Sequence, residues 1–140
     1  MKLLALRKPD EIFKKSPNLV INCADKPFGI DIFFDKASTK YNIPVIFGSY
    51  ASTTINTVAK IPGKTINISD FLDDNAITNK SMINSEIPTS VIAPATFMVA
   101  SMVSYYVVML LTSLRTPTTA IQIDMDGWKV LKYDISKKRS

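Results

Sequence analysis

Histidine is absent from this chain of 140 residues, and cysteine occurs only once, at Cys23. An internal disulfide bond is therefore impossible, which fits a reducing, cytoplasmic compartment. The chain cannot build a zinc site from cysteine and histidine ligands of its own. Catalysis of the Ser-His-Asp or Cys-His type is excluded as well, because each needs an imidazole to carry a proton.

Glycine is also scarce, with four residues at Gly29, Gly48, Gly63 and Gly127. No two of them form a Gly-x-Gly pattern, so the sequence has no glycine-rich loop of the kind that cradles nucleotide phosphates. A secretory signal is not expected, because the apolar run before Arg7 has only four residues. That run is too short for the core of a signal peptide.

The overall composition is that of a globular protein. Hydrophobic residues make up 46% and charged residues 21% of the chain, and this length predicts one domain over residues 1–140. Seventeen basic against twelve acidic residues give a net charge of +5. The basic residues lie mostly near the two ends, and no aromatic residues alternate with the C-terminal cluster. We therefore expect a solvated surface and no nucleic-acid partner.

The stretch from Asn18 to Thr65 predicts the unit around which the rest is arranged. The branched apolar run Leu19–Cys23 is typical of a strand buried on both faces. Apolar residues from Phe28 to Tyr41 then recur at helical spacing, and Pro44 precedes a second apolar strand. Strands joined through a helix in this way pair in parallel, with a right-handed crossover.

The carboxyl ends of these strands are the expected site. Asp25 lies in the turn after the first strand, and Gly48, Ser49 and Tyr50 are expected to form a loop at the same edge. Open α/β sheets bind their ligands at this edge. Residues from Thr53 onward alternate as in a further strand, which ends at a Pro-Gly turn.

The second half of the chain predicts a loop, a long helix and a hairpin. Residues 66–90 are polar and irregular, as in a crossover loop. Val91–Leu114 carries no charge over 24 positions, which is long enough for a membrane span. Pro94, scattered serine and threonine residues and flanks without a basic anchor favour a buried or dimer-interface helix, with the span as the weaker alternative. Asp126-Gly127 predicts an antiparallel hairpin, and residues 135–140 are expected to form a frayed tail.

These elements predict an α/β fold, a partial Rossmann-like three-layer domain. Its sheet is expected to be mixed, with a long buried helix and a C-terminal antiparallel hairpin. The edge before Leu19 is expected to be unpaired, which predicts a homo- or hetero-oligomer because exposed edges associate.

Four motifs follow one another in the first half of the chain: the turn Cys23-Ala24-Asp25, the helix face Asp35–Tyr41, the strand Pro44–Gly48 and the turn Pro62-Gly63-Lys64-Thr65. In this order they resemble the second half of the ThiF/MoeB/HesA family, the E1-like adenylyltransferases. The helix that starts near Ala93 and the final hairpin are similar to the branch that modifies microcin C-type peptides. The resemblance extends over roughly residues 16–134.

The resemblance implies one reaction. The carboxylate of a peptide or small protein attacks the α-phosphate of ATP, and an acyl-adenylate forms with loss of pyrophosphate. Asp25 is implied as the catalytic, cofactor-binding and metal-binding residue, because a carboxylate suits the Mg²⁺ that bridges the phosphates. Gly48, Ser49, Tyr50 and Thr53 are implied as substrate-binding residues near the incoming carboxylate.

The chain departs from the family pattern at its nucleotide and zinc motifs. The family's glycine-rich ATP loop belongs to the half that has no counterpart here, so ATP and Mg²⁺ are expected only with a partner that supplies that half. The cysteine pairs of the family's structural zinc are absent after Thr65. The loop 66–90 also lacks a cysteine that could form a thioester.

Two functions from different classes remain open. The first is a partial module for carboxylate adenylation of a peptide or small protein, active only with a partner. The second is a non-catalytic E1-like subunit that binds a peptide or serves as a scaffold. A small membrane-associated protein is a third possibility that depends on Val91–Leu114 alone. Asp25 also has a purely structural interpretation, as the N-cap of the following helix.

Overall fold

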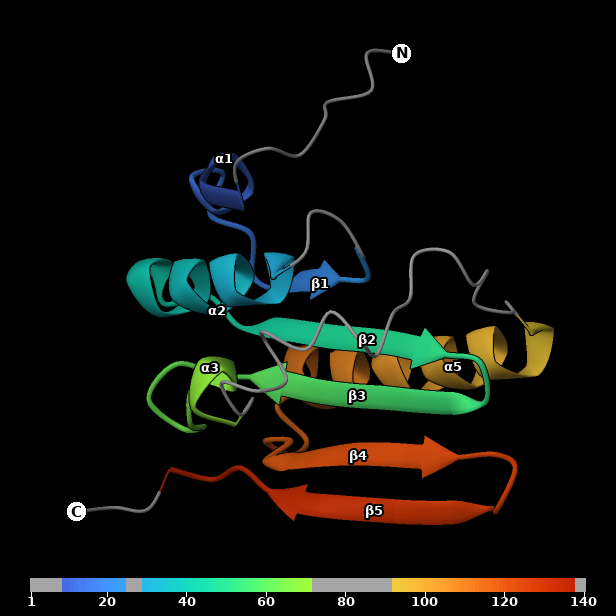
Figure 1. Ribbon diagram of the computed structural model, residues 1–140. Coiled ribbons are helices and arrows are strands. Elements are labelled where there is room, and N and C mark those ends of the chain that lie inside the picture. The colour runs from blue at the N-terminus through green and yellow to red at the C-terminus, as the bar shows by residue number, and fades with distance from the viewer. Residues whose placement is uncertain (1–8, 25–28, 72–91, 138–140) are drawn as a thin grey trace.

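The computed structural model describes residues 9–24, 29–71 and 92–137, which form one sheet with helices on both faces (Figure 1). Its strands are β1 (Val20–Asn22), β2 (Val45–Ala51), β3 (Thr54–Lys60), β4 (Thr119–Asp124) and β5 (Lys129–Asp134), in the spatial order β1-β2-β3-β4-β5. β1 and β2 are parallel, and the other neighbours are antiparallel. The sheet is therefore mixed, as predicted.

The helices of the described residues are α1 (Pro9–Phe13), α2 (Ile30–Tyr41), α3 (Ile68–Phe71) and α5 (Ala93–Leu111). α2 connects the parallel strands and ends where Asn42 adopts a left-handed conformation, with φ of 56°. Such a residue is a common helix terminator, since it turns the chain out of the helical path. The predicted strand–helix–strand unit is confirmed.

The sheet separates two apolar cores, which gives three layers. Alternate side chains of a strand point to opposite faces, so Val45 and Phe47 of β2 pack beneath α1, α2 and α3, whereas Ile46 packs against α5. We call the first side the α2 face and the second the α5 face. Phe13 of α1 is fully buried in the α2-face core, where its ring lies 5.8 Å from that of Tyr41.

The close approach of α5 to the sheet depends on Gly48 in β2. A Cβ atom at this position would lie 2.5 Å from Cγ2 of Val103 and 3.2 Å from Cγ2 of Val99. Tyr106 connects α5 to β4, because its hydroxyl donates a hydrogen bond to the Thr119 carbonyl at 2.7 Å. α5 thus backs the centre of the sheet and holds the start of β4.

α5 buries one side and exposes the other, which corrects the expectation of a helix covered all round. Its exposed side is uncharged, with a few serine and threonine residues among large apolar and aromatic ones. The large residues include Phe97, 74% of whose surface is accessible, with Tyr105, Val108 and Leu111. In length and composition α5 could cross a membrane, but its buried side packs on the sheet as a layer of the domain. The dimer-interface alternative agrees with this exposed side.

Two expectations about the first strands are wrong. Gly48–Tyr50 is not a loop, because β2 continues to Ala51 in antiparallel register with β3. β1 is not buried on both faces, since Ile21 is 48% exposed. α5 packs behind β2 and β3 and leaves that side of β1 open.

The end of the chain is held in place, which corrects the expectation of a frayed tail for residues 135–137. Ile135 is buried, its amide donates to the Thr118 carbonyl at 2.8 Å, and its carbonyl accepts from the Ile66 amide at 3.0 Å. Ser136 also forms a bridge with Thr65. Residues 138–140 lie outside the described residues, as do residues 72–90 of the predicted crossover loop.

Replacing Gly48 with alanine should destabilise the fold by about 1–3 kcal/mol, because the new methyl group would overpack the contact with Val103. Urea denaturation measures the change. Gly127→Ala is the matched control, since its Cβ would meet nothing closer than 3.6 Å. Adding Val103→Ala to Gly48→Ala should recover part of the loss, and an additive double variant would contradict the contact.

Tyr106→Phe should cost about 0.5–1.5 kcal/mol, because it leaves the Thr119 carbonyl without its donor. Burial raises the pKa of Tyr106, outweighing the opposite effect of Arg115. A raised folded-state pKa contributes stability that is complete below the ordinary value, about 10, and is lost as pH rises through the raised value. The unfolding temperature of the wild type should therefore fall more steeply above pH 10 than that of Tyr106→Phe. Tyr105→Phe, at an exposed position, should behave as the wild type.

Candidate functional site

A pocket opens on the α2 face of the sheet, beside the carboxyl end of β1. Its volume is about 290 Å³, at the lower end of the range for small-ligand sites. Residues from α2, α3 and four strands line it: Asp31, Phe47, Ser49, Asn56, Thr57, Val58, Ile68, Ala120, Ile121, Gln122 and Tyr133. The lining residues lie across the middle of β2 to β5 on this face, and the turn at Asp25, where the sequence predicts the site, lies outside the described residues.

Asp31 brings a carboxylate to this pocket from the first turn of α2. Asn22, at the end of β1, donates from Nδ2 to Oδ1 of Asp31 at 2.6 Å, and its own Oδ1 accepts from the Ala24 amide at 3.3 Å. The Asn22 side chain is buried, so these bonds orient the carboxylate relative to β1. A carboxylate in the first turn also interacts favourably with the helix dipole.

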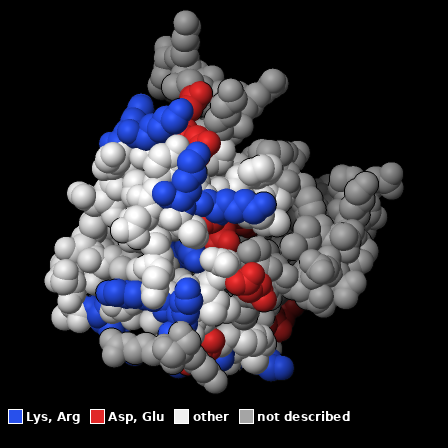
Figure 2. Space-filling model, turned by 90° about the vertical axis from the view of Figure 1, so that its left-hand side faces the viewer, with Lys and Arg blue, Asp and Glu red and all other residues white. Residues whose placement is uncertain are grey.

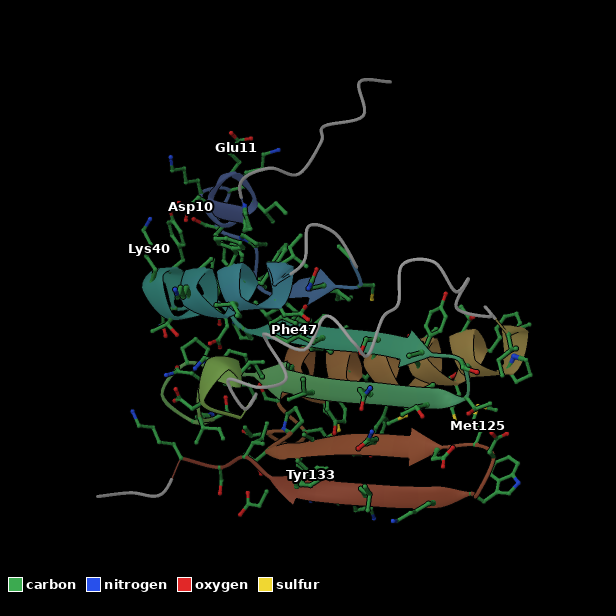
Figure 3. The ribbon with its side chains drawn as sticks, viewed as in Figure 1. Asp10, Glu11, Lys40, Phe47, Met125 and Tyr133 are labelled. Atoms are coloured by element: carbon green, nitrogen blue, oxygen red, sulfur yellow. The ribbon has the colours of Figure 1, made fainter. Side chains whose placement is uncertain are left out.

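A row of neutral polar side chains crosses the strands beside Asp31. Ser49 of β2 pairs with Asn56 of β3, and Asn56 pairs with Gln122 of β4. Residues directly opposite one another project from the same face, with Cβ atoms about 5 Å apart. Tyr133 joins them from β5, while Phe47 belongs to the apolar floor (Figure 3). The pocket thus combines an apolar floor with hydrogen-bonding groups.

The structure divides the residues predicted as substrate-binding between two faces. Ser49 lines the pocket, whereas Gly48 and Tyr50 point to the α5 face, where both pack near α5. Thr53 lies in the turn between β2 and β3, and its carbonyl accepts from the Met125 amide at 3.0 Å. Asp25 lies outside the described residues, so its role stays a prediction.

One wall of the pocket depends on the buried side chain of Lys60, at the end of β3. Its Nζ donates to Oδ1 of Asn67 at 2.7 Å and to the Ile66 carbonyl at 3.3 Å. The same ammonium lies 3.8 Å from Oδ1 of Asp35 in α2. Lys60 therefore joins α2, β3 and the segment that leads into α3, where Ile68 lines the pocket.

The described residues do not by themselves fit a triphosphate and its metal ion. They contain no group of three or more histidine, cysteine or acidic side chains that could hold a metal, and among the described residues that line the pocket Asp31 is the single carboxylate. On the side shown in Figure 2, lysine and arginine side chains are separated by acidic and uncharged surface.

Ser49 is the one predicted site residue in the described pocket lining, and the missed residues include the polar side chains of Asp31, Asn56, Gln122 and Tyr133. Asp31 lies in the helix that was predicted from its apolar residues alone, and Asn56 lies in the strand predicted from Thr53 onward. The polar positions Asn56 and Gln122 do share one face of their strands, which is a usable signal. Their meeting with Ser49, however, depends on the pairing of strands far apart in the sequence.

Comparison with models of protein families shows to which family the chain belongs. The model of the ThiF family matches residues 2–139. The chain belongs to the ThiF family.

Solved structures show the same E1-like adenylyltransferase fold. E. coli MccB with ATP matches with a TM-score of 0.74 and 20% identity, over 92% of this chain and 41% of MccB. The microcin C7 biosynthetic enzyme MccB in complex with N-formylated MccA also gives a TM-score of 0.74 at 20% identity, over 92% of this chain and 42% of MccB. PaaA matches with a TM-score of 0.61 and 14% identity, over 92% of this chain and 39% of PaaA. No curated protein matches the chain.

This ThiF-family chain spans about two fifths of the length of these structures. At such identities the likeness shows the fold, and the predicted three-layer Rossmann-like architecture is confirmed by it. The resemblance inferred from the motifs around Asp25, Gly48 and Pro62-Gly63-Lys64-Thr65 therefore identified the right family.

Lys60→Met should destabilise the domain by about 3–5 kcal/mol, because it removes the ammonium that neutralises the buried carboxylate of Asp35. Urea denaturation provides the measurement, with the exposed Lys64→Met as control. The double variant Lys60→Met with Asp35→Leu should recover most of the loss, since apolar replacement of a buried pair is often neutral. A single variant as stable as the wild type would contradict this role.

Proposed function

We propose that this chain is the peptide-side module of a carboxylate adenylation reaction. It binds the carboxyl-terminal segment of a peptide or small protein, and a partner supplies the ATP-binding half. The observation that carries the proposal is the pocket beside the carboxyl end of β1. It offers hydrogen-bonding groups on an apolar floor, and the described residues around it gather no site for a triphosphate.

The solved relatives support this division of the reaction. MccB was crystallised with ATP, and also with the MccA peptide. Since this chain spans about two fifths of MccB, both activities cannot be transferred to it as they stand. A pocket of about 290 Å³ suits a side chain and a short stretch of backbone better than a whole nucleotide.

Four of the five predicted site residues take a place in this proposal. Ser49, with Asn56 and Gln122, donates and accepts hydrogen bonds to the bound peptide. Gly48 and Tyr50 act from the opposite face, where they hold β2 against α5. Asp25 is proposed as the ligand of the Mg²⁺ that accompanies ATP when the partner is present.

A second candidate is a non-catalytic E1-like subunit in a cytoplasmic assembly. The observation that favours it is the exposed apolar side of α5, with Phe97 and Leu111, because surfaces of this kind mark sites of association. Both candidates predict a homo- or hetero-oligomer, and only the first predicts acyl-adenylate formation.

Pyrophosphate exchange separates the two. The chain alone should give no ATP–pyrophosphate exchange and no micromolar ATP binding by calorimetry, whereas exchange should appear with a captured partner that carries a glycine-rich ATP loop. Ser49→Arg should abolish that exchange by filling the pocket, and Thr39→Arg, exposed on α2, should leave it unchanged. Strong Mg²⁺-dependent ATP binding by the chain alone would contradict the need for a partner. Absence of exchange with every captured partner would favour the non-catalytic subunit.

A further inference from the structure

The exposed side of α5 is large enough for a specific protein interface. Among the described helices α5 is the single one on its face of the sheet, so no other described helix covers it (Figure 1). Phe97, Tyr105, Val108 and Leu111 each expose more than half of their surface there. With the small exposed residues between them, this side amounts to roughly 700 Å², and one partner contributes about 800 Å² to a standard interface.

Most hydroxyl groups on this side lose contact with water at little cost. Those of Thr96, Ser101 and Thr112 each donate to the carbonyl oxygen four residues earlier in α5, at 3.1, 2.9 and 2.6 Å. Groups that are hydrogen-bonded already do not become unsatisfied donors when a partner covers them. α5 also has no charged residue from Ala93 to Leu111. The exposed side therefore suits an uncharged, largely apolar surface.

The order of large and small residues along this side is symmetric. Phe97, Ser101, Ser104 and Val108 are exposed and follow one another at intervals of four, three and four residues, which places them along one line of the helix. In size they read large, small, small, large. A two-fold axis between Ser101 and Ser104 brings Phe97 of one copy opposite Val108 of the other, and Ser101 opposite Ser104. A contact between two identical surfaces requires such self-complementarity.

We propose that two copies of this chain associate through α5, with the helices antiparallel and the two-fold axis between Ser101 and Ser104. The small residues at the centre let the two helices approach closely, and the large ones fill the space at both ends. The Ser104 hydroxyl is a donor that the Ser101 oxygen of the second copy accepts. Antiparallel helix dipoles also attract one another.

This contact is compatible with the other properties of the chain. The net charge of +5 repels a second copy at long range, but that repulsion is screened over about 8 Å at physiological salt. The contact itself brings no like charges together, since α5 has none. The edge of the sheet at β1 stays free for a different partner. The inference therefore does not rest on the proposed function.

Sedimentation velocity of the full chain tests this contact from 1 to 100 μM, at 0.15 M salt and without detergent. The wild type should shift from monomer to dimer with a dissociation constant on the order of micromolar. The double variant Ser101→Glu with Ser104→Glu should raise that constant at least about 100-fold, because four carboxylates would meet at the axis. Lys36→Glu with Thr39→Glu, exposed on α2 at the same spacing, is the matched control and should leave the dimer unchanged.

A charge exchange identifies the second copy as the occupant. Ser101→Lys with Ser104→Lys should be monomeric by itself, for the same reason as the glutamate variant. An equimolar mixture of the two double variants should form a one-to-one heterodimer, because opposite charges then face each other across the axis. Circular dichroism and thermal unfolding verify that every variant is folded.

Four outcomes would overturn the inference. They are a wild type that is monomeric at 100 μM, a dimer that tolerates the two glutamates, and a mixture of the double variants that stays monomeric. The fourth is binding of the wild type to neutral phosphatidylcholine vesicles in place of dimerisation, which would assign this side of α5 to a bilayer.

Discussion

The buried ammonium of Lys60 is the interaction on which the α2 side of the domain depends. It is 2% exposed, and an ammonium withdrawn from water is costly unless other groups replace its hydration. Asp35, Asn67 and the Ile66 carbonyl do so from three separate segments. None of these segments can shift without uncovering a charge. The position of the pocket wall at Ile68 therefore depends on this electrostatic constraint as well as on apolar packing.

A steric constraint acts on the other face of the same sheet. β2 contributes both to the contact with α5 and to the pocket, because its residues alternate between the two faces of the sheet. Gly48 admits α5 to close contact, and Ser49 beside it opens onto the pocket. This alternation explains why a short sequence such as Gly48-Ser49-Tyr50 resembled a loop. Its small residues reflect a close helix on one side and a ligand-facing surface on the other, within a continuous strand.

Much of the fold could be predicted from local sequence patterns. The helical spacing from Ile30 to Tyr41 and the Asp126-Gly127 pair depend on neighbours in sequence, and both elements form where they were predicted. The failures concern partners distant in sequence. Nothing local indicates that Ile135 is tied to Ile66, or that α5 leaves one side uncovered. Of the predicted site residues Ser49 lines the candidate pocket, but the polar row beside it is assembled by strand register, which local patterns leave undetermined.

The proposed function requires a partner, and two exposed apolar surfaces among the described residues suit association. β1 is the last strand of the sheet among the described residues, and Ile21 faces the side of α5 with no helix behind it. α5 exposes Phe97 and Leu111 on that same side of the sheet. An element that pairs with β1 would cover Ile21 and also lie next to the turn that follows Asn22. In the proposed function, the exposed side of β1 at Ile21 and the proposed nucleotide-binding edge after Asn22 are adjacent, so one partner would contact both.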